Sequence, residues 1–257
     1  MALQLGQAIS DGIGRVLSTT GAVLFAGLLA IQLVTQVGIN TAVVGFLPPE
    51  AASAAATGSP GISLPVPPGV GVALTLVGIV VSTVYFVVLA RALSRPRREL
   101  STFPSTLYTR RILRATLATF LGGLVVSVAV SIGFVLLVLP GIFLAASFLL
   151  FIFAAGVEAR GELGSLSRSW ALARGSRLKL SLLVVAVGVV GGLVGTVGTL
   201  LDVAGLGSLS DVAVTVVNSG FFLAVYGTLA AAYGQLRDGE SRTTTTAASG
   251  TDETARL

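Results

Sequence analysis

The 257-residue sequence contains no cysteine and no histidine, and only 11% of its residues are charged. Without cysteine, the chain forms no disulfide and has no thiolate nucleophile. Without histidine, it lacks the commonest metal ligand and the commonest general base. Carboxylates, tyrosines and hydroxyl groups remain for chemistry, and no paired carboxylates or nucleotide-binding loop are evident among them. We therefore expect a protein that is not an enzyme, with no catalytic residues, no metal and no cofactor.

Hydrophobic residues are abundant instead, since they make up 54% of the chain, and another 32 residues are glycine. A soluble domain has about 25% charged residues, because polar groups must cover its surface. The net charge of +5 does not indicate nucleic acid, because the basic residues lie beside hydrophobic runs rather than on a polar surface. The composition predicts a membrane protein with no nucleic-acid partner.

Six hydrophobic windows are long enough to cross a bilayer core of about 30 Å, which takes around 20 helical residues. They lie near residues 17–39, 70–90, 115–138, 142–157, 180–201 and 212–234. The windows predict an all-α integral membrane protein with six transmembrane helices in a single polytopic domain, residues 1–237. The polar segment 238–257 predicts a disordered cytoplasmic tail.

The basic residues are all on one side of the membrane if both termini are on that side. This side then holds all 16 Lys and Arg residues, and the other side holds only Glu50, Asp202 and Asp211. Cytoplasmic loops retain basic residues, so we expect a multi-pass protein of the cell membrane with its amino and carboxyl termini in the cytoplasm.

Short amphipathic segments precede the first, third and fifth windows. The clearest one, near residues 162–173, has four apolar residues on one helical face and three polar residues away from it. These are, respectively, Leu163, Leu166, Trp170 and Ala173, and Ser165, Arg168 and Ser169. If the three segments correspond, the fold is three hairpins, each preceded by a short amphipathic interfacial helix.

Arginines between residues 91 and 114 form the strongest cluster of charge, opposed only by Glu99. Retention of positive charge in the cytoplasm accounts for such a cluster by itself. Arg110, Arg111 and Arg114 are also candidates to bind anionic lipid headgroups, each contributing about 1 kcal/mol near a charged leaflet.

Three amides are the main polar groups within the windows: Gln32, Gln36 and Asn218. They either form hydrogen bonds between helices or line a polar pocket for a small solute or lipid headgroup. In the fifth window, Gly188 and Gly192, like Gly191 and Gly195, are four residues apart, a spacing that predicts close helix packing.

The tripeptide Leu139-Pro140-Gly141 interrupts a long apolar run. Proline removes a backbone donor and glycine can adopt a positive φ, so the tripeptide predicts the turn between the third and fourth helices.

A wider stretch around this turn resembles a known membrane family. The matching positions are Leu139, Pro140, Gly141, Glu158, Ser169, Trp170, Leu172, Arg174 and Gly175. It is similar to the membrane domain of some glycerophosphodiester phosphodiesterases, and more closely to uncharacterised six-helix membrane proteins of prokaryotes. The resemblance implies an architecture and no activity, because the phosphodiesterase reaction belongs to a separate histidine-containing domain.

The sequence thus favours a non-catalytic membrane protein that binds or organises lipids or a membrane partner, with anionic headgroups on the cytoplasmic face as the expected ligands. The alternative is a transporter or channel for a small solute or lipid. The absence of ionisable residues within the windows disfavours ion-coupled transport. Whether the chain also binds a protein partner or a second copy of itself stays open.

Overall fold

The computed structural model describes residues 3–48, 50–51, 62–109, 111–158 and 161–254. The fold is 85% helical, and none of the described residues forms a β-strand. The prediction of an all-α protein is confirmed. The helices are α1 (Leu5–Val16), α2 (Thr19–Phe46), α4 (Pro68–Leu93), α5 (Thr106–Thr109), α6 (Ile112–Leu136), α7 (Val138–Phe148), α8 (Phe151–Glu158), α9 (Glu162–Ala173), α10 (Arg177–Val203) and α11 (Gly207–Thr254), with a 3₁₀ helix η1 at Arg97–Glu99.

Six helical segments are long and apolar enough to cross a membrane. They are Thr19–Phe46, Pro68–Leu93, Ile112–Leu136, Val138–Glu158, Arg177–Val203 and Leu209–Gly239. Each overlaps one of the predicted windows. The fourth segment combines α7 and α8, which are separated by a turn at Leu149 and Leu150. By length and composition, these helices fit a multi-pass membrane protein.

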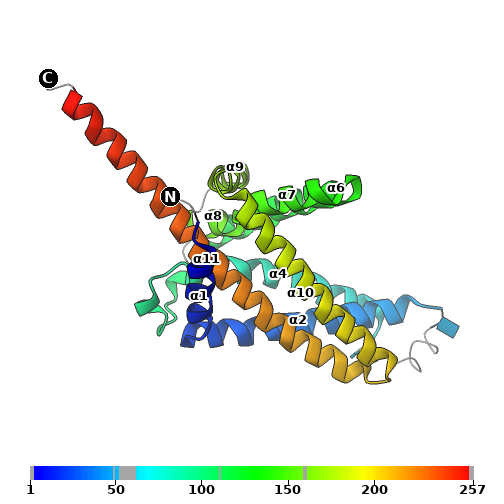
Figure 1. Cartoon of the computed structure of the whole chain (residues 1–257). Coiled ribbons are helices and arrows are strands. Elements are labelled where there is room, and N and C mark those ends of the chain that lie inside the picture. Colours follow the sequence, from blue (N-terminus) through cyan, green and yellow to red (C-terminus); the bar gives the residue numbers. More distant parts are fainter. Residues whose placement is uncertain (1–2, 49, 52–61, 110, 159–160, 255–257) are drawn as a thin grey trace.

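Consecutive long helices pack in pairs, α2 on α4, α6 on α7 and α10 on α11. Figure 1 shows the connections within these pairs at one end of the molecule and both chain termini toward the other. We call the end that contains α1, η1, α5 and α9 the basic end, because the described arginines lie in or next to these elements. The half that contains the three connections is called the opposite half.

The turn between α6 and α7 lies at Leu137, two residues before the position that the sequence predicts. Leu137 is extended, with φ −164° and ψ 147°, and α7 begins at Val138. Pro140 therefore lies in the first turn of α7, where its missing N–H would have no helical acceptor anyway. Gly141 has no positive φ. A Cβ there would lie 2.5 Å from the Phe134 ring, so glycine permits the close approach of α6 and α7.

The last helix continues further than expected. The sequence predicts disorder from residue 238, whereas α11 is helical as far as Thr254 and leaves the bundle as a single extension (Figure 1). The physical reason is that lengthening an existing helix needs no new nucleation step. Residues 255–257 of the predicted tail lie outside the described residues.

Helix α9 does not separate buried apolar residues from exposed polar ones in the way that its periodicity predicts. Ser165 and Ser169 are fully buried against the bundle, whereas the Leu163 side chain is 82% exposed. Small serine side chains let the helix approach its neighbours closely, and the Ser169 hydroxyl donates to the Ser147 carbonyl oxygen of α7 at 2.9 Å. The predicted apolar face is divided, since Leu163 is exposed, Trp170 is half-buried and Ala173 is fully buried.

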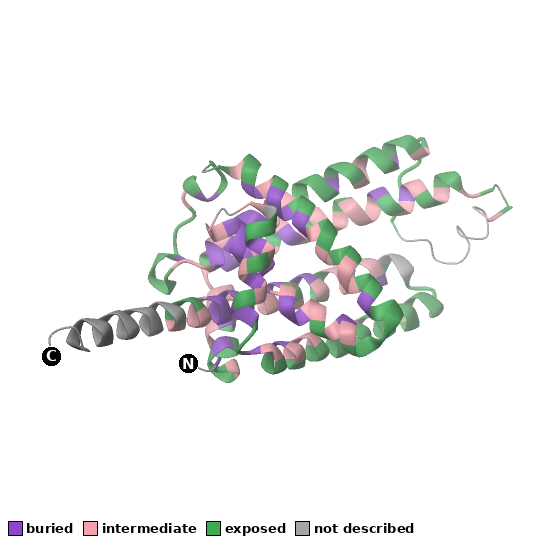
Figure 2. Cartoon of the chain, turned by 90° about the horizontal axis from the view of Figure 1, so that it is seen from above, coloured by how far each residue is buried: buried purple, intermediate pink, exposed green. Residues whose placement is uncertain are grey.

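The core lies toward the basic end. Figure 2 shows the buried residues gathered there, while the ends of the helices in the opposite half are mostly exposed. The largest buried side chains include Leu89, Leu93, Phe153 and Tyr233.

Close glycine contacts occur both at the basic end and in the opposite half. Helix α1 crosses α11 at Gly12, where a Cβ would lie 2.4 Å from the Thr228 backbone nitrogen. The glycines of α10 differ, because a Cβ at Gly188, Gly191, Gly192 or Gly195 would meet no atom within 4 Å. The predicted close packing at this α10 motif does not occur within the chain.

Candidate functional site

Arginines at the basic end bind backbone carbonyls of other elements. Arg15 of α1 donates from Nη1 to the Leu93 and Arg95 carbonyl oxygens, at 2.5 and 2.6 Å, where α4 ends. A cation at a helix carboxyl terminus satisfies carbonyls that have no helical partner and interacts favourably with the helix dipole. Burial, and then the nearby Arg97, lower the pKa of the Arg15 guanidinium, while Asp11 raises it.

Two further arginines connect separate elements in the same way. Arg97 donates to the Asp11 carbonyl oxygen at 3.0 Å and forms an ion pair with its carboxylate at 3.3 Å. Arg91 donates from Nε to the Gly156 carbonyl oxygen at 2.8 Å and from Nη1 to Leu107 at 3.1 Å. These contacts hold α1, α5 and α8 against the end of α4, so the arginine cluster also has a structural role.

A polar cavity of about 490 Å³ lies among these contacts, between α4, α5, α6 and α8. Among the described residues, its charged lining consists of Arg91, Arg95, Arg111 and Glu158. Arg95 is held by a 2.8 Å hydrogen bond to the Thr102 carbonyl oxygen and by an ion pair with Glu99 at 3.5 Å. Three guanidinium groups and one carboxylate give this cavity a net positive charge.

Arg111 marks the start of α6 and has an unusual backbone. Its φ is 47°, in the left-handed region that non-glycine residues rarely adopt. It precedes the first residue of α6, and no side chain caps that helix end. Unpaired N–H groups at a helix amino terminus attract anions, so this helix end adds to the positive potential of the polar cavity.

The predicted headgroup site is only partly assembled by the structure. Arg111 lines the polar cavity. Arg114 is exposed one turn further along α6 and does not line it, and Arg110 lies outside the described residues. From the sequence, Arg91 and Arg95 were not distinguished from the other arginines of the cluster. Their spacing of four residues across the end of an apolar window is a signal that they share a helical face.

Glu158 lies at the edge of the cavity and joins three helices. Its Oε1 accepts hydrogen bonds from Arg168 Nε of α9, at 3.2 Å, and from the Tyr233 hydroxyl of α11. The Tyr233 ring stacks on Phe153 with centroids 5.8 Å apart. Glu158 is one of the family-pattern positions, and this geometry gives it a role in joining α8, α9 and α11.

Trp170, another family-pattern position, attaches α9 to α7. Its ring lies 5.8 Å from that of Phe143 and 5.7 Å from that of Phe148. The Arg177 guanidinium lies 4.3 Å from the Trp170 ring centroid, in cation–π geometry.

The other family-pattern residues of α9 and the segment after it differ in environment. Leu172 is buried, whereas Arg174 and Gly175 are exposed.

The predicted intramembrane amides have different environments. Gln32 of α2 donates to the Ser219 hydroxyl of α11 at 3.0 Å, which is a bond between helices. Gln36 donates to Asn40 of its own helix at 3.2 Å. Asn218 is partly buried, and no hydrogen bond of its side chain occurs among the described residues. No hydrogen bond joins any two of these three amides in the described part of the chain.

Acidic residues do not gather into a cation site. Within the described part of the chain, no group of three or more Asp, Glu, His or Cys side chains could hold a metal ion.

Comparison with known proteins assigns the whole bundle to one family. Residues 3–236 match the family described as a domain of unknown function (DUF7847). The chain belongs to the DUF7847 family. The matched region begins just before α1 and ends within α11, so the polar cavity lies inside the DUF7847 domain. No curated protein and no solved structure matches the chain, and no link to the glycerophosphodiester phosphodiesterases is shown.

Proposed function

We propose that this DUF7847 protein is a non-catalytic, multi-pass protein of the cell membrane that binds anionic lipid headgroups at its basic end. The supporting observation is the polar cavity, where Arg91, Arg95 and Arg111 surround the uncapped start of α6. Guanidinium groups form strong charge-assisted hydrogen bonds to phosphate oxygens. The shared chemistry is therefore that of a phosphate-bearing anion.

The cavity is organised before any ligand binds. Arg91 and Arg95 are positioned by backbone carbonyls of Gly156 and Thr102, at 2.8 Å each. Fixed side chains lose less conformational freedom when a ligand binds. Glu158 is the one acidic residue among the described residues that line the cavity, and its negative charge is offset by Arg168 at 3.2 Å.

The proposed membrane placement sets the basic end in the cytoplasmic interface and the six apolar helices in the bilayer. The concentration of arginine at one end supports this orientation. Pairing of α2 with α4, α6 with α7 and α10 with α11 supports three hairpins. Helices α1 and α9 precede the first and third hairpins as surface helices, while α5 has only 4 residues before the second.

Arg111→Ala tests the headgroup site, with Arg114→Ala as the matched control on the same helix. The purified full chain is reconstituted in nanodiscs of phosphatidylcholine with or without phosphatidylglycerol, and its thermal unfolding is measured. We expect phosphatidylglycerol to stabilise the wild type and Arg114→Ala equally, and to stabilise Arg111→Ala less, because only Arg111 lines the cavity.

Two results would contradict this assignment. If phosphatidylglycerol stabilises the wild type and Arg111→Ala equally, the polar cavity is not where the lipid binds. Inorganic phosphate added to phosphatidylcholine nanodiscs forms the second arm. If it stabilises the protein as much as phosphatidylglycerol does, the cavity binds a soluble anion and the proposed lipid ligand is wrong.

A further inference from the structure

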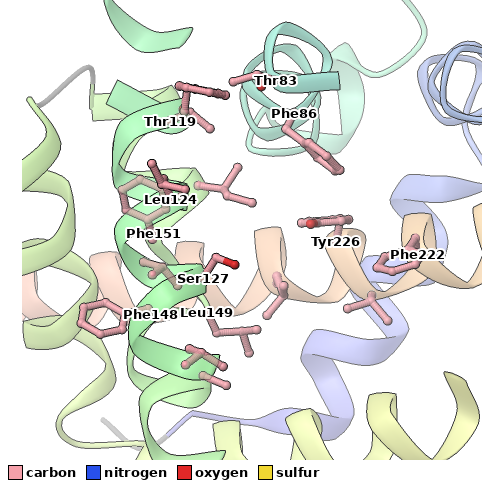
Figure 3. A pocket seen from close by; sticks show the side chains of 18 of the residues that line it. Thr83, Phe86, Thr119, Leu124, Ser127, Phe148, Leu149, Phe151, Phe222 and Tyr226 are labelled. Atoms are coloured by element: carbon pink, nitrogen blue, oxygen red, sulfur yellow. The ribbon is translucent and has the colours of Figure 1, made fainter. Parts of the chain in front are cut away.

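A second, apolar cavity lies inside the bundle and is separate from the polar one. It measures about 600 Å³ and lies between α4, α6, α8 and α11 (Figure 3). Buried alanines lie between the two sets of lining residues along three of these helices: Ala90 of α4, Ala118 of α6 and Ala155 of α8. Small-molecule sites are typically about 300–1,000 Å³ and mostly apolar with a few polar groups. The apolar cavity falls within this description.

Three hydroxyl groups with no hydrogen-bond partner among the described residues interrupt its mostly hydrocarbon wall. Thr119 and Ser127 come from α6, and Tyr226 comes from α11. Thr119 is only 7% exposed, and its Oγ1 is buried with no hydrogen-bond partner. No hydrogen bond of the Ser127 or Tyr226 hydroxyl to another described residue occurs either. These groups are the polar features that a ligand would meet.

Several other hydroxyls in the apolar helices are satisfied locally. Thr83, which also lines the apolar cavity, donates to the Ile79 carbonyl oxygen at 2.9 Å. Ser147 and Thr228 donate in the same way to the carbonyl four residues earlier, at 2.8 and 2.9 Å. Such bonds remove the penalty of placing a hydroxyl in hydrocarbon. The Thr119 hydroxyl forms no such bond to the carbonyl four residues earlier.

The hydroxyls converge on the cavity. Figure 3 shows the Ser127 and Tyr226 hydroxyls pointing toward one another across it. The Tyr226 ring is held by Phe86 and Phe222, with centroids 5.3 and 6.4 Å away. Gly123 lies between Thr119 and Ser127 on the same face of α6, and a Cβ there would meet no atom within 4 Å. Ser127 is exposed although it lines the cavity, so the cavity is open at this side.

We propose that the apolar cavity binds a neutral lipid-like molecule, with a hydrocarbon body and one uncharged oxygen group that pairs with the Ser127 and Tyr226 hydroxyls. The aromatic and aliphatic wall provides contacts for the hydrocarbon. No Asp, Glu, Lys or Arg is among the described residues that line the cavity, so it offers no partner for a charged group. The ligand enters from the bilayer at the open side. This site is additional to the anionic headgroup site and does not depend on it.

Photolabelling tests the proposal on the full chain in phosphatidylcholine nanodiscs, with a diazirine analogue of hexadecanol as the probe. Gly123→Leu fills the cavity and should reduce labelling of α6 and α11 peptides at least about tenfold, because the added side chain occupies the ligand volume. Gly191→Leu is the matched control, since a Cβ at either glycine meets no atom within 4 Å. The control should be labelled like the wild type.

The hydroxyl requirement is tested separately, with a variant that keeps the tyrosine ring. Tyr226→Phe should weaken probe binding about fivefold, the effect of one hydrogen bond. Unlabelled hexadecanol should compete with the probe, and hexadecane at the same concentration should compete much less. Equal labelling of Gly123→Leu and wild type would overturn the site. Equal competition by the alcohol and the alkane, or unchanged binding to Tyr226→Phe, would overturn the role of the hydroxyls.

Discussion

The basic end and the opposite half of this protein are built differently. At the basic end, helices meet through buried side chains and arginine-to-carbonyl bonds. In the opposite half, large apolar side chains are exposed, for example Val135 at 86% and Leu139 at 79%. With the proposed membrane placement, the difference follows from the surroundings. Lipid can cover the apolar half, whereas helix ends at the interface need polar partners.

The largest effect should come from disturbing the α1–α11 crossing at the basic end. A Cβ at Gly12 would lie 2.4 Å from the Thr228 backbone nitrogen, and Gly12→Val adds two further methyl groups at this position. Backbone cannot move aside like a flexible side chain, so we expect a loss of about 3 kcal/mol or more in the free energy of unfolding. Gly6→Val is the control, because a Cβ at Gly6 meets no atom within 4 Å. Denaturant unfolding in detergent measures both, and equal effects of the two variants would refute the crossing.

Removing the Arg15 guanidinium should have the next largest effect. Arg15→Met keeps an apolar side chain of similar length but leaves the Leu93 and Arg95 carbonyl oxygens without this donor. The site is partly open to solvent, so we expect a loss of about 1.5 kcal/mol, the lower limit for hydrogen bonds to charged groups. Arg114→Met, at an exposed position, should unfold at the wild-type temperature. If Arg15→Met unfolds at the wild-type temperature, the Arg15 charge does not stabilise the fold and acts only in orienting the chain in the membrane.

Two tyrosines of α11 compare a hydroxyl at the basic end with a hydroxyl at the apolar cavity. Tyr233→Phe removes a hydroxyl that bonds to Glu158, and should lower the free energy of unfolding by about 1 kcal/mol. Tyr226→Phe removes a hydroxyl with no described hydrogen-bond partner, so without a ligand it should not destabilise the protein. Thermal unfolding of the two variants in the same detergent gives the comparison. If Tyr226→Phe loses as much stability as Tyr233→Phe, the Tyr226 hydroxyl has a structural bond and the apolar cavity loses a ligand-binding group.

The sequence alone predicts the helical class and the six long apolar helices, because length and composition determine both. It misplaces details that depend on packing. Proline and glycine at 140 and 141 suggest the turn itself, but both lie inside α7, where the first helical turn tolerates proline and the Phe134 ring requires glycine. Ser165 and Ser169 look solvent-facing by periodicity, yet they are buried, because a small polar side chain can pack as closely as alanine.

The polar cavity was only partly predictable for a related reason. The density of arginine indicates a charged interface, and Arg111 was among the predicted contacts. Which other arginines line the cavity depends on where α4 ends relative to α6 and α8, and no local pattern in the sequence specifies that arrangement. The three hydroxyls of the apolar cavity were missed too, since isolated Thr, Ser and Tyr residues are common in apolar helices and become notable only when their partners are known.

The smallest expected effect is the most informative about the opposite half. Gly191→Ala adds a methyl group where a Cβ meets no atom within 4 Å, so the folded chain can accept it without strain. Alanine has the higher helix propensity, and we expect thermal unfolding in detergent to show no loss, or a gain of up to about 1 kcal/mol. A loss larger than 1 kcal/mol would mean that the glycine face of α10 is in close contact with another helix in the folded protein. The opposite half would then be a packed interface between chains, and its exposure would not reflect contact with lipid.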